Sequence, residues 1–122
     1  MSANILTVDD SASIRMTTKI ALTNAGYQVT EAVDGADGLN KAKGGSFDLI
    51  VTDLNMPNMN GLEMIEALRQ SPAHTGIPII FLTTESDADM KARAKAAGAT
   101  GWVTKPFDPE NLVKIVKKVL GR

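Results

Sequence analysis

The sequence has 122 residues, of which 43% are hydrophobic and 22% are charged, and it contains no cysteine. These values are typical of one globular domain spanning residues 1–122, and they exclude a disulfide framework and thiol chemistry. Thirteen basic against fourteen acidic residues give a formal net charge of -1, so no overall field attracts nucleic acid or an anionic membrane. The sequence shows no export signal, and its most apolar run, residues 77–82, is far shorter than the ~20 residues of a membrane-spanning helix. We therefore expect a cytoplasmic protein with no nucleic-acid partner and no membrane insertion.

Strands and helices are predicted in strict alternation along the chain. The runs 5–8, 47–51 and 79–82 are almost continuously apolar, which is typical of strands covered on both faces, and 27–33 and 101–104 are further β-prone runs. Helices are predicted at about 11–25, 36–43, 61–71, 87–97 and 108–120. The last helix is the clearest, with Asp108 as N-cap and Pro109 at its first position. At the fourth helix, Ser86-x-x-Asp89 resembles a capping box.

This alternation predicts an α/β fold of the (βα)5 type. Right-handed crossovers between successive strands give a doubly wound, parallel, five-stranded sheet between two layers of helices. No linker, repeat or low-complexity segment is visible, so we expect no attached output domain.

Polar residues follow four of the predicted strands at the point where each strand ends: Asp9 and Asp10, then Asp53, then Thr83 and Thr84, then Lys105. The carboxyl ends of parallel strands share one edge of the sheet, where ligands of open α/β folds bind, so these residues are expected to converge. Two carboxylates at ~4 Å repel by about 4 kcal/mol at an effective dielectric near 20, and a cation is needed to hold three. Ligands that are all oxygen favour Mg²⁺, beside which Lys105 supplies a fixed positive charge.

A lone Asp after a strand is usually a turn or capping residue, so Asp53 gains significance only from its companions. Asp10, Asp53, Thr83 and Lys105, in this order, form a constellation that capping does not explain. His74, the single histidine, lies in a polar loop far in sequence from the carboxylates, and we interpret it as a surface residue.

Several motifs resemble the response-regulator receiver family over essentially the whole chain. They are Val8-Asp9-Asp10-Ser11, the Asp53-Leu54-Asn55-Met56-Pro57 run with Gly61, Thr83-Thr84-Glu85, and Lys105-Pro106-Phe107. The Gly101-Trp102-Val103-Thr104 run and Asp34-Gly35 are similar in particular to the single-domain chemotaxis type, called CheY. The resemblance implies the strand order 2-1-3-4-5.

The resemblance also implies a role for each site residue. Asp53 would be the phosphoacceptor. Asp10, the Asp53 carboxylate and the Asn55 main-chain carbonyl would bind Mg²⁺, with Asp9 acting mainly through a metal-bound water. Thr83 and Lys105 would contact phosphoryl oxygens, and the Lys105–Pro106 bond would be cis. Trp102 would be the aromatic switch residue, and Thr84 and Glu85 would modulate the rates, Thr84 being bulkier than the Ala or Gly usual there.

The resemblance also implies partners. A CheA-like histidine kinase would donate the phosphate, and a flagellar motor switch protein would bind the phosphorylated form. A phosphatase is a further candidate partner. The protein would be a monomeric phosphoacceptor that assists its own phosphorylation and dephosphorylation. Its target would bind the face made by residues 87–97, 101–104 and 108–120, which carries Lys91, Arg93, Lys95, Lys114, Lys117 and Lys118.

Other interpretations remain open at this point. A phosphate sink or a relay intermediate would have the same pocket, and a degenerate receiver would serve only as a binding module. An aspartyl-phosphate phosphatase needs a second Asp two positions after the nucleophile, where this chain has Asn55. A flavodoxin-like carrier needs a phosphate-cradling loop after the first strand, where Asp9 and Asp10 would repel phosphate.

Overall fold

The computed structural model describes residues 3–54, 56, 59–70, 76–83, 88–105 and 107–121, and of Met90 only the backbone. The interpretations placed on Asn55, His74, Thr84, Glu85, Ser86 and the Lys105–Pro106 bond fall on residues outside these ranges. Ten elements alternate along the described chain: β1 (Asn4–Val8), α1 (Ala12–Asn24), β2 (Gln28–Ala32), α2 (Gly35–Gly44), β3 (Leu49–Thr52), α3 (Gly61–Arg69), β4 (Ile79–Thr83), α4 (Ala88–Ala96), β5 (Gly101–Thr104) and α5 (Pro109–Leu120). The predicted element types are confirmed, with ends that differ by two residues or fewer.

The five strands form one parallel sheet in the order β2-β1-β3-β4-β5, as predicted. β1 and β3 are neighbours, with Val8 opposite Thr52, and β4 pairs with β5 so that Thr83 lies opposite Thr104. All described residues of β3 and β4 are buried. This explains their continuous apolar sequence, because helices cover both faces of the sheet.

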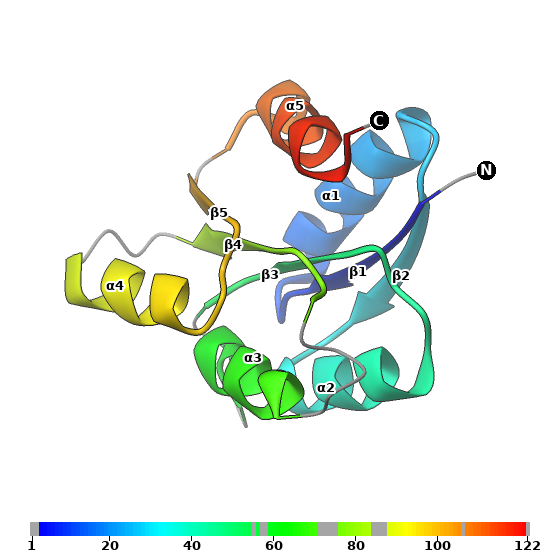
Figure 1. Ribbon diagram of the computed structural model, residues 1–122. Helices are drawn as coiled ribbons and strands as arrows, with labels where there is room; N and C mark the ends of the chain where they lie inside the picture. The colour runs from blue at the N-terminus through cyan, green and yellow to red at the C-terminus, as the bar shows by residue number, and fades with distance from the viewer. Residues whose placement is uncertain are drawn as a thin grey trace.

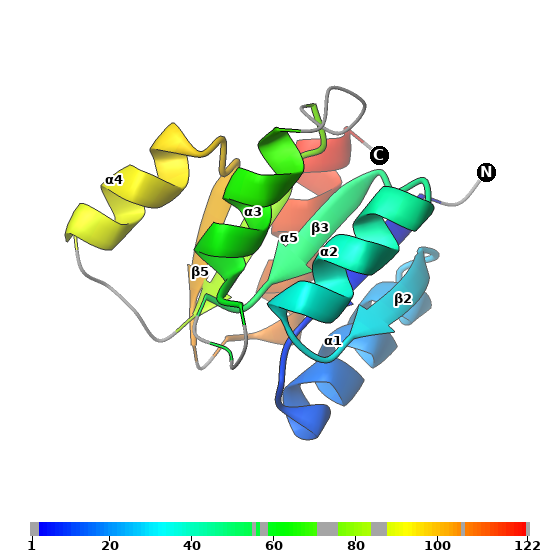
Figure 2. The ribbon, with the colours of Figure 1, turned by 90° about the horizontal axis from the view of Figure 1, so that it is seen from below.

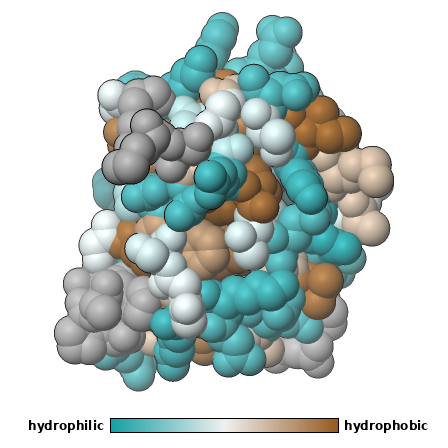
Figure 3. Space-filling model, turned by 90° about the vertical axis from the view of Figure 1, so that its right-hand side faces the viewer, coloured by the Kyte–Doolittle hydropathy of each residue, from teal (hydrophilic) through white to brown (hydrophobic). Residues whose placement is uncertain are grey.

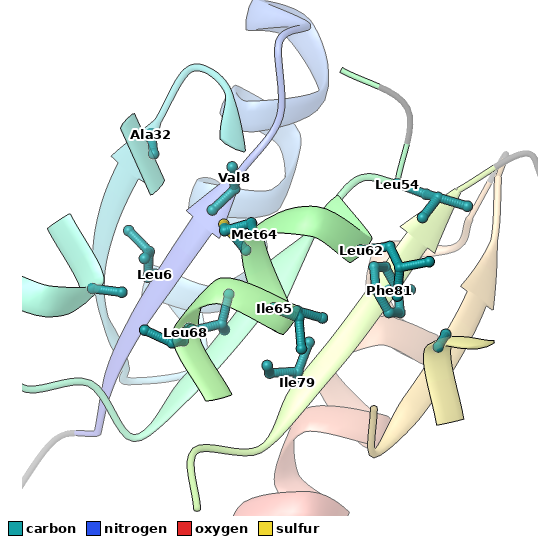
Figure 4. Packing of buried hydrophobic residues seen from close by; sticks show 13 residues of the cluster. Leu6, Val8, Ala32, Leu54, Leu62, Met64, Ile65, Leu68, Ile79 and Phe81 are labelled. Atoms are coloured by element: carbon teal, nitrogen blue, oxygen red, sulfur yellow. The ribbon is translucent and has the colours of Figure 1, made fainter. Parts of the chain in front are cut away.

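Two helical layers enclose the sheet (Figure 1). α1 and α5 cover one face, where Leu22 of α1 and Leu112 and Val116 of α5 pack against the strands. α2, α3 and α4 lie on the other face, which Figure 2 shows from below. There, Met64 and Leu68 of α3 pack with apolar residues of β1, β3 and β4 (Figure 4). The two cores fix the sheet from both sides.

Side-chain caps define where the helices begin. Ser11 accepts a hydrogen bond from the backbone N–H of Ile14 at the start of α1, and Asp34 accepts one from Asp37 N–H at the start of α2. Asn60 and Glu63 form a reciprocal capping box on α3. Asp108 caps α5 with Pro109 at its first position, which confirms the predicted start.

α4 is attached to the rest of the molecule mainly at its C-terminal end. Among its described side chains only Ala94 is buried. The Arg69 guanidinium, from the end of α3, donates hydrogen bonds to the carbonyls of Ala97 (3.2 Å), Gly98 (3.1 Å) and Ile77 (2.8 Å). Arg69 therefore ties the end of α4 to the segment that leads into β4.

The side of the molecule on which the strands begin is covered mostly by hydrophilic and neutral residues, with separate hydrophobic areas (Figure 3). Within the described ranges, no helix combines the length and apolarity that crossing a membrane requires. Of the polar residues predicted to carry function, those that the structure describes lie at the opposite side, where the strands end.

Candidate functional site

Three carboxylates converge at the carboxyl edge of the sheet. One oxygen from each of Asp9, Asp10 and Asp53 lies within 4.8 Å of the others. Asp9 and Asp53 are buried, whereas Asp10 is exposed. Hydrogen bonds that continue the sheet ladders past the strand ends hold the two buried residues, since Asp53 N–H donates to Val8 O (2.8 Å) and Asp9 N–H to Ala32 O (3.1 Å). The predicted acidic cluster is therefore present.

Lys105 is the cation of this cluster. Its Nζ lies 3.0 Å from Asp9 Oδ2 and 3.4 Å from Asp53 Oδ2, and the side chain is only 14% exposed. Its backbone N–H donates to the Thr83 carbonyl (2.8 Å), which fixes the end of β5 against the end of β4. One ammonium group thus contacts two of the three carboxylates, and the remaining negative charge could hold a divalent cation.

Backbone N–H groups orient the buried carboxylates. Leu54 N–H donates to Asp53 Oδ1 (2.8 Å), and Ser11 N–H donates to Asp9 Oδ1 (2.9 Å). The second oxygen of each carboxylate faces Lys105. Both buried carboxylates are therefore held in a fixed direction before any ligand binds.

Burial raises the pKa of Asp53 above its ordinary value of 3.8, and the neighbouring Asp9 charge raises it further. The charge of Lys105 and the hydrogen bonds from Leu54 and Lys105 oppose this rise without cancelling it. The ionised form of Asp53 is thus partly uncompensated in the protein alone. A bound divalent cation would remove this penalty.

Two glycines allow loops to approach closely beside the site. A Cβ at Gly61 would overlap the carbonyl oxygen of Asp53, and one at Gly35 would overlap the carbonyl oxygen of Met59. Gly35 N–H also donates to that Met59 oxygen (3.1 Å). Asp53 is therefore packed against the start of α3, and Met59 against the start of α2.

Thr83, at the end of β4, is fully buried, and β4 is the neighbour of β3, which Asp53 follows. Trp102 lies on β5 opposite Phe81. The Trp102 and Phe81 rings are 5.7 Å apart at 51°. The Trp102 Nε1 is buried without a hydrogen-bond partner, and Lys91 Nζ lies 5.6 Å from the ring centroid.

Sequence reasoning missed Arg15. Its Nη1 donates to the carbonyl of Asp9 at 2.6 Å, so it contacts the backbone between two of the clustered acids. The sequence did contain a signal. A positively charged Arg near the start of a helix interacts unfavourably with the helix dipole, so its presence there indicates a contact outside the helix.

The family model for the response regulator receiver domain matches residues 5–117. The chain belongs to this family. Receivers take phosphate from histidine kinases in two-component phosphorelays, and they bind Mg²⁺ at an acidic pocket such as that of Asp9, Asp10 and Asp53. This chain is accordingly a phosphoacceptor switch domain.

Three similar proteins illustrate the range of the family. The chemotaxis protein CheY4 of Vibrio cholerae is 45% identical, with a TM-score of 0.93 over 98% of this chain and 99% of that one. The response regulator ArlR of Staphylococcus aureus is 37% identical over 97% of this chain, which spans only about half (52%) of ArlR. The receiver domain of a Pseudomonas aeruginosa sensor histidine kinase (25% identity, TM-score 0.90, 100% of both chains) has a magnesium ion in its active-site cleft.

We expect Asp53→Asn to raise the free energy of unfolding at pH 7.5 in EDTA. Because the pKa of Asp53 is higher in the folded than in the unfolded chain, its stabilising contribution is complete below 3.8 and is lost as the pH rises through the folded-state pKa. The advantage of the variant should therefore shrink between pH 7.5 and 4.5 in urea titrations. Glu66→Gln, at an exposed position, is the control. Equal stability of wild type and Asp53→Asn at both pH values would contradict the raised pKa.

We also expect Mg²⁺ to bind with a Kd on the order of 1 mM, because a site with few protein oxygens and several waters is weak. At 10 mM Mg²⁺ this binding should stabilise the fold by about 1.4 kcal/mol. Asp10→Ala should abolish the stabilisation, while Asp89→Ala on α4 should retain it. Calorimetric titration and thermal unfolding measure both effects, and an unchanged Mg²⁺ affinity in Asp10→Ala would remove Asp10 from the metal site.

Proposed function

We propose that Asp53 accepts the phosphoryl group of a phosphohistidine on a partner kinase. The observation that carries this proposal is the orientation of the Asp53 carboxylate, with one oxygen held by Leu54 N–H and the other facing Lys105 beside Asp9. A carboxylate oxygen of Asp53 forms the new O–P bond as the P–N bond to the imidazole breaks, and the histidine leaves as the free imidazole. The acceptor is thus aligned before the donor arrives.

The reaction places more negative charge in a pocket that already has an excess of it. Lys105 pairs with one phosphoryl oxygen, and the Thr83 hydroxyl donates to another, as the resemblance implies. Asp10, Asp53 and the Asn55 carbonyl would hold Mg²⁺, with Asp9 acting mainly through a metal-bound water, and the cation would neutralise the remaining charge. The same arrangement exposes the acyl phosphate to water, so the receiver assists its own dephosphorylation, at a rate modulated by Thr84 and Glu85.

We propose that the effect of phosphorylation is transmitted from the site through β4 and β5 to the surface formed by α4, β5 and α5. On β4 and β5, Phe81 lies opposite Trp102, and Thr83 lies opposite Thr104. A movement of Thr83 towards a phosphoryl group would therefore displace the strand that carries Phe81, and with it the contact between the Phe81 and Trp102 rings. Lys91, above the Trp102 ring, extends this contact to α4. Phosphorylation would then shift the population of Trp102 positions and with it the surface that a target recognises.

We further propose a chemotaxis role, with a CheA-like kinase as donor and a flagellar motor switch protein as target. The support is the 45% identity to a chemotaxis receiver over nearly the full length of both chains. ArlR, at 37% identity, is a response regulator that is not named for chemotaxis, so a phosphate sink or relay intermediate is the second candidate. In either role the receiver would act as a monomer in the cytoplasm, with a phosphatase as a further partner.

Phosphotransfer assays test the donor and the acceptor together. The wild-type receiver should take phosphate within seconds from a phosphorylated CheA-like kinase, and far more slowly from non-cognate kinases. Asp53→Asn should take none, from the kinase or from acetyl phosphate, because an amide is a much weaker nucleophile. Intact-protein mass spectrometry detects the product. A base-labile phosphate appearing on Asp53→Asn at the wild-type rate would refute Asp53 as acceptor, and equal transfer from all kinases would argue against the chemotaxis assignment.

Trp102 fluorescence tests the switch, because this is the only tryptophan in the sequence. Beryllofluoride with Mg²⁺ should shift the emission to the blue and reduce acrylamide quenching, as the ring moves further from water. The change should be modest, since Trp102 already packs on Phe81 with its Nε1 buried. Thr83→Ala should eliminate it, and Thr104→Ala on the neighbouring strand serves as the control. No change in Trp102 exposure at confirmed beryllofluoride occupancy would exclude this residue as the switch.

A further inference from the structure

Arg15 of α1 joins the acidic pocket to the edge of the sheet. Its side chain is only 17% exposed, and its Nη1 donates to the Asp9 carbonyl at 2.6 Å. That carbonyl belongs to the peptide group between Asp9 and Asp10. On the other side of the guanidinium, Nε lies 3.7 Å from Glu31 Oε1 on β2. Arg15 is therefore the one described cationic side chain recorded in contact with the backbone that links two of the clustered carboxylates.

Stabilisation of α1 does not explain this placement. Arg15 lies near the N-terminus of the helix, where a cation costs about 0.3–1 kcal/mol against the helix dipole. Its ion pair with Glu31 is long and partly exposed, and Lys19 shares that carboxylate at the same 3.7 Å distance. Such pairs contribute little to stability. The short hydrogen bond to Asp9 is the contact that distinguishes Arg15 from Lys19.

We propose that Arg15 is a positioning residue for the phosphorylation site, which holds the Asp9–Asp10 peptide group so that both carboxylates are directed at the cation that they bind. A peptide group is planar, so fixing its carbonyl fixes the direction of the chain on both sides. Asp9 then has its carbonyl held by Arg15, Oδ1 by Ser11 N–H and Oδ2 by Lys105. Glu31 keeps the guanidinium in place. This inference rests on the proposed binding of Mg²⁺ by Asp10 directly and by Asp9 mainly through a metal-bound water.

Two accounts of Arg15 make opposite predictions. If Arg15 acted only as a nearby positive charge, its removal would strengthen the attraction of the pocket for Mg²⁺. If it positions the peptide group, its removal weakens Mg²⁺ binding, because residues that orient metal ligands typically contribute a factor of about 10 or more to affinity. The sign of the change therefore decides between them.

The experiment compares Arg15→Met with Lys19→Met. Both substitutions remove one positive charge that pairs with Glu31, but only Arg15 contacts Asp9. Calorimetric titration with MgCl2 at constant ionic strength, well below the unfolding temperature, should show the Kd raised about tenfold in Arg15→Met and unchanged or slightly lowered in Lys19→Met. The rate of phosphorylation by acetyl phosphate should fall with Mg²⁺ affinity at low Mg²⁺ and recover towards wild type at saturating Mg²⁺.

An equal or tighter Kd in Arg15→Met would overturn the proposal, as would equal weakening in Lys19→Met. Arg15→Lys keeps the positive charge but loses the planar guanidinium that donates to the Asp9 carbonyl, and it should raise the Kd by a smaller factor, whereas a purely electrostatic role predicts no change. This variant decides the question if circular dichroism shows that Arg15→Met is unfolded, and an unaltered Kd there would then refute the positioning role. If the wild type itself shows no Mg²⁺ binding that depends on Asp10, the proposed metal site fails rather than the role of Arg15.

Discussion

One ammonium group stands against three carboxylates at the carboxyl edge of this sheet, and the function of the site depends on that imbalance. Lys105 contacts Asp9 and Asp53 directly, yet the pKa of Asp53 remains above its ordinary value because burial and the charge of Asp9 outweigh the lysine. The pocket is therefore ready for additional positive charge. In the proposed function a divalent cation would supply it and a phosphoryl group would bring negative charge back, so occupancy by each ligand would alter the free energy of binding of the other.

The fold maintains this unfavourable arrangement by fixing the backbone around it. The carboxylates are attached to strands buried on both faces, and ladder hydrogen bonds from Asp9 and Asp53 extend the sheet beyond the strand ends. Gly61 lets α3 begin against the carbonyl of Asp53, where any side chain would collide. Because these contacts hold Asp9 and Asp53 in place, a bound cation would relieve their repulsion without movement of the backbone.

Sequence patterns predicted the fold and the convergence of the acidic residues because both depend on regular geometry. Continuous apolar runs indicated strands buried on both faces, and parallel strands bring their carboxyl ends to one edge. The contacts that depend on side-chain direction were not predictable in this way. Arg15 donates to the carbonyl of Asp9, and Arg69 at the end of α3 donates to the carbonyl of Ala97 just after α4. The spacing of these residues in the sequence does not predict either pairing.

In the proposed switch, Trp102 would connect the charged pocket to the surface that a target recognises. Its indole Nε1 is buried with no hydrogen-bond partner, which costs on the order of 1–3 kcal/mol, while the ring gains from contact with Phe81 and from the ammonium of Lys91. Packing of the ring against the hydrophobic core adds to these gains, so the ring stays packed although its Nε1 has no partner. Lys105 and Thr83 are joined by a backbone hydrogen bond at the ends of the same two strands. In the proposed switch, a ligand that contacts both residues would act on the two strands that carry the Phe81–Trp102 pair, and it could move Trp102 only by as much as its affinity differs between the two positions of the ring.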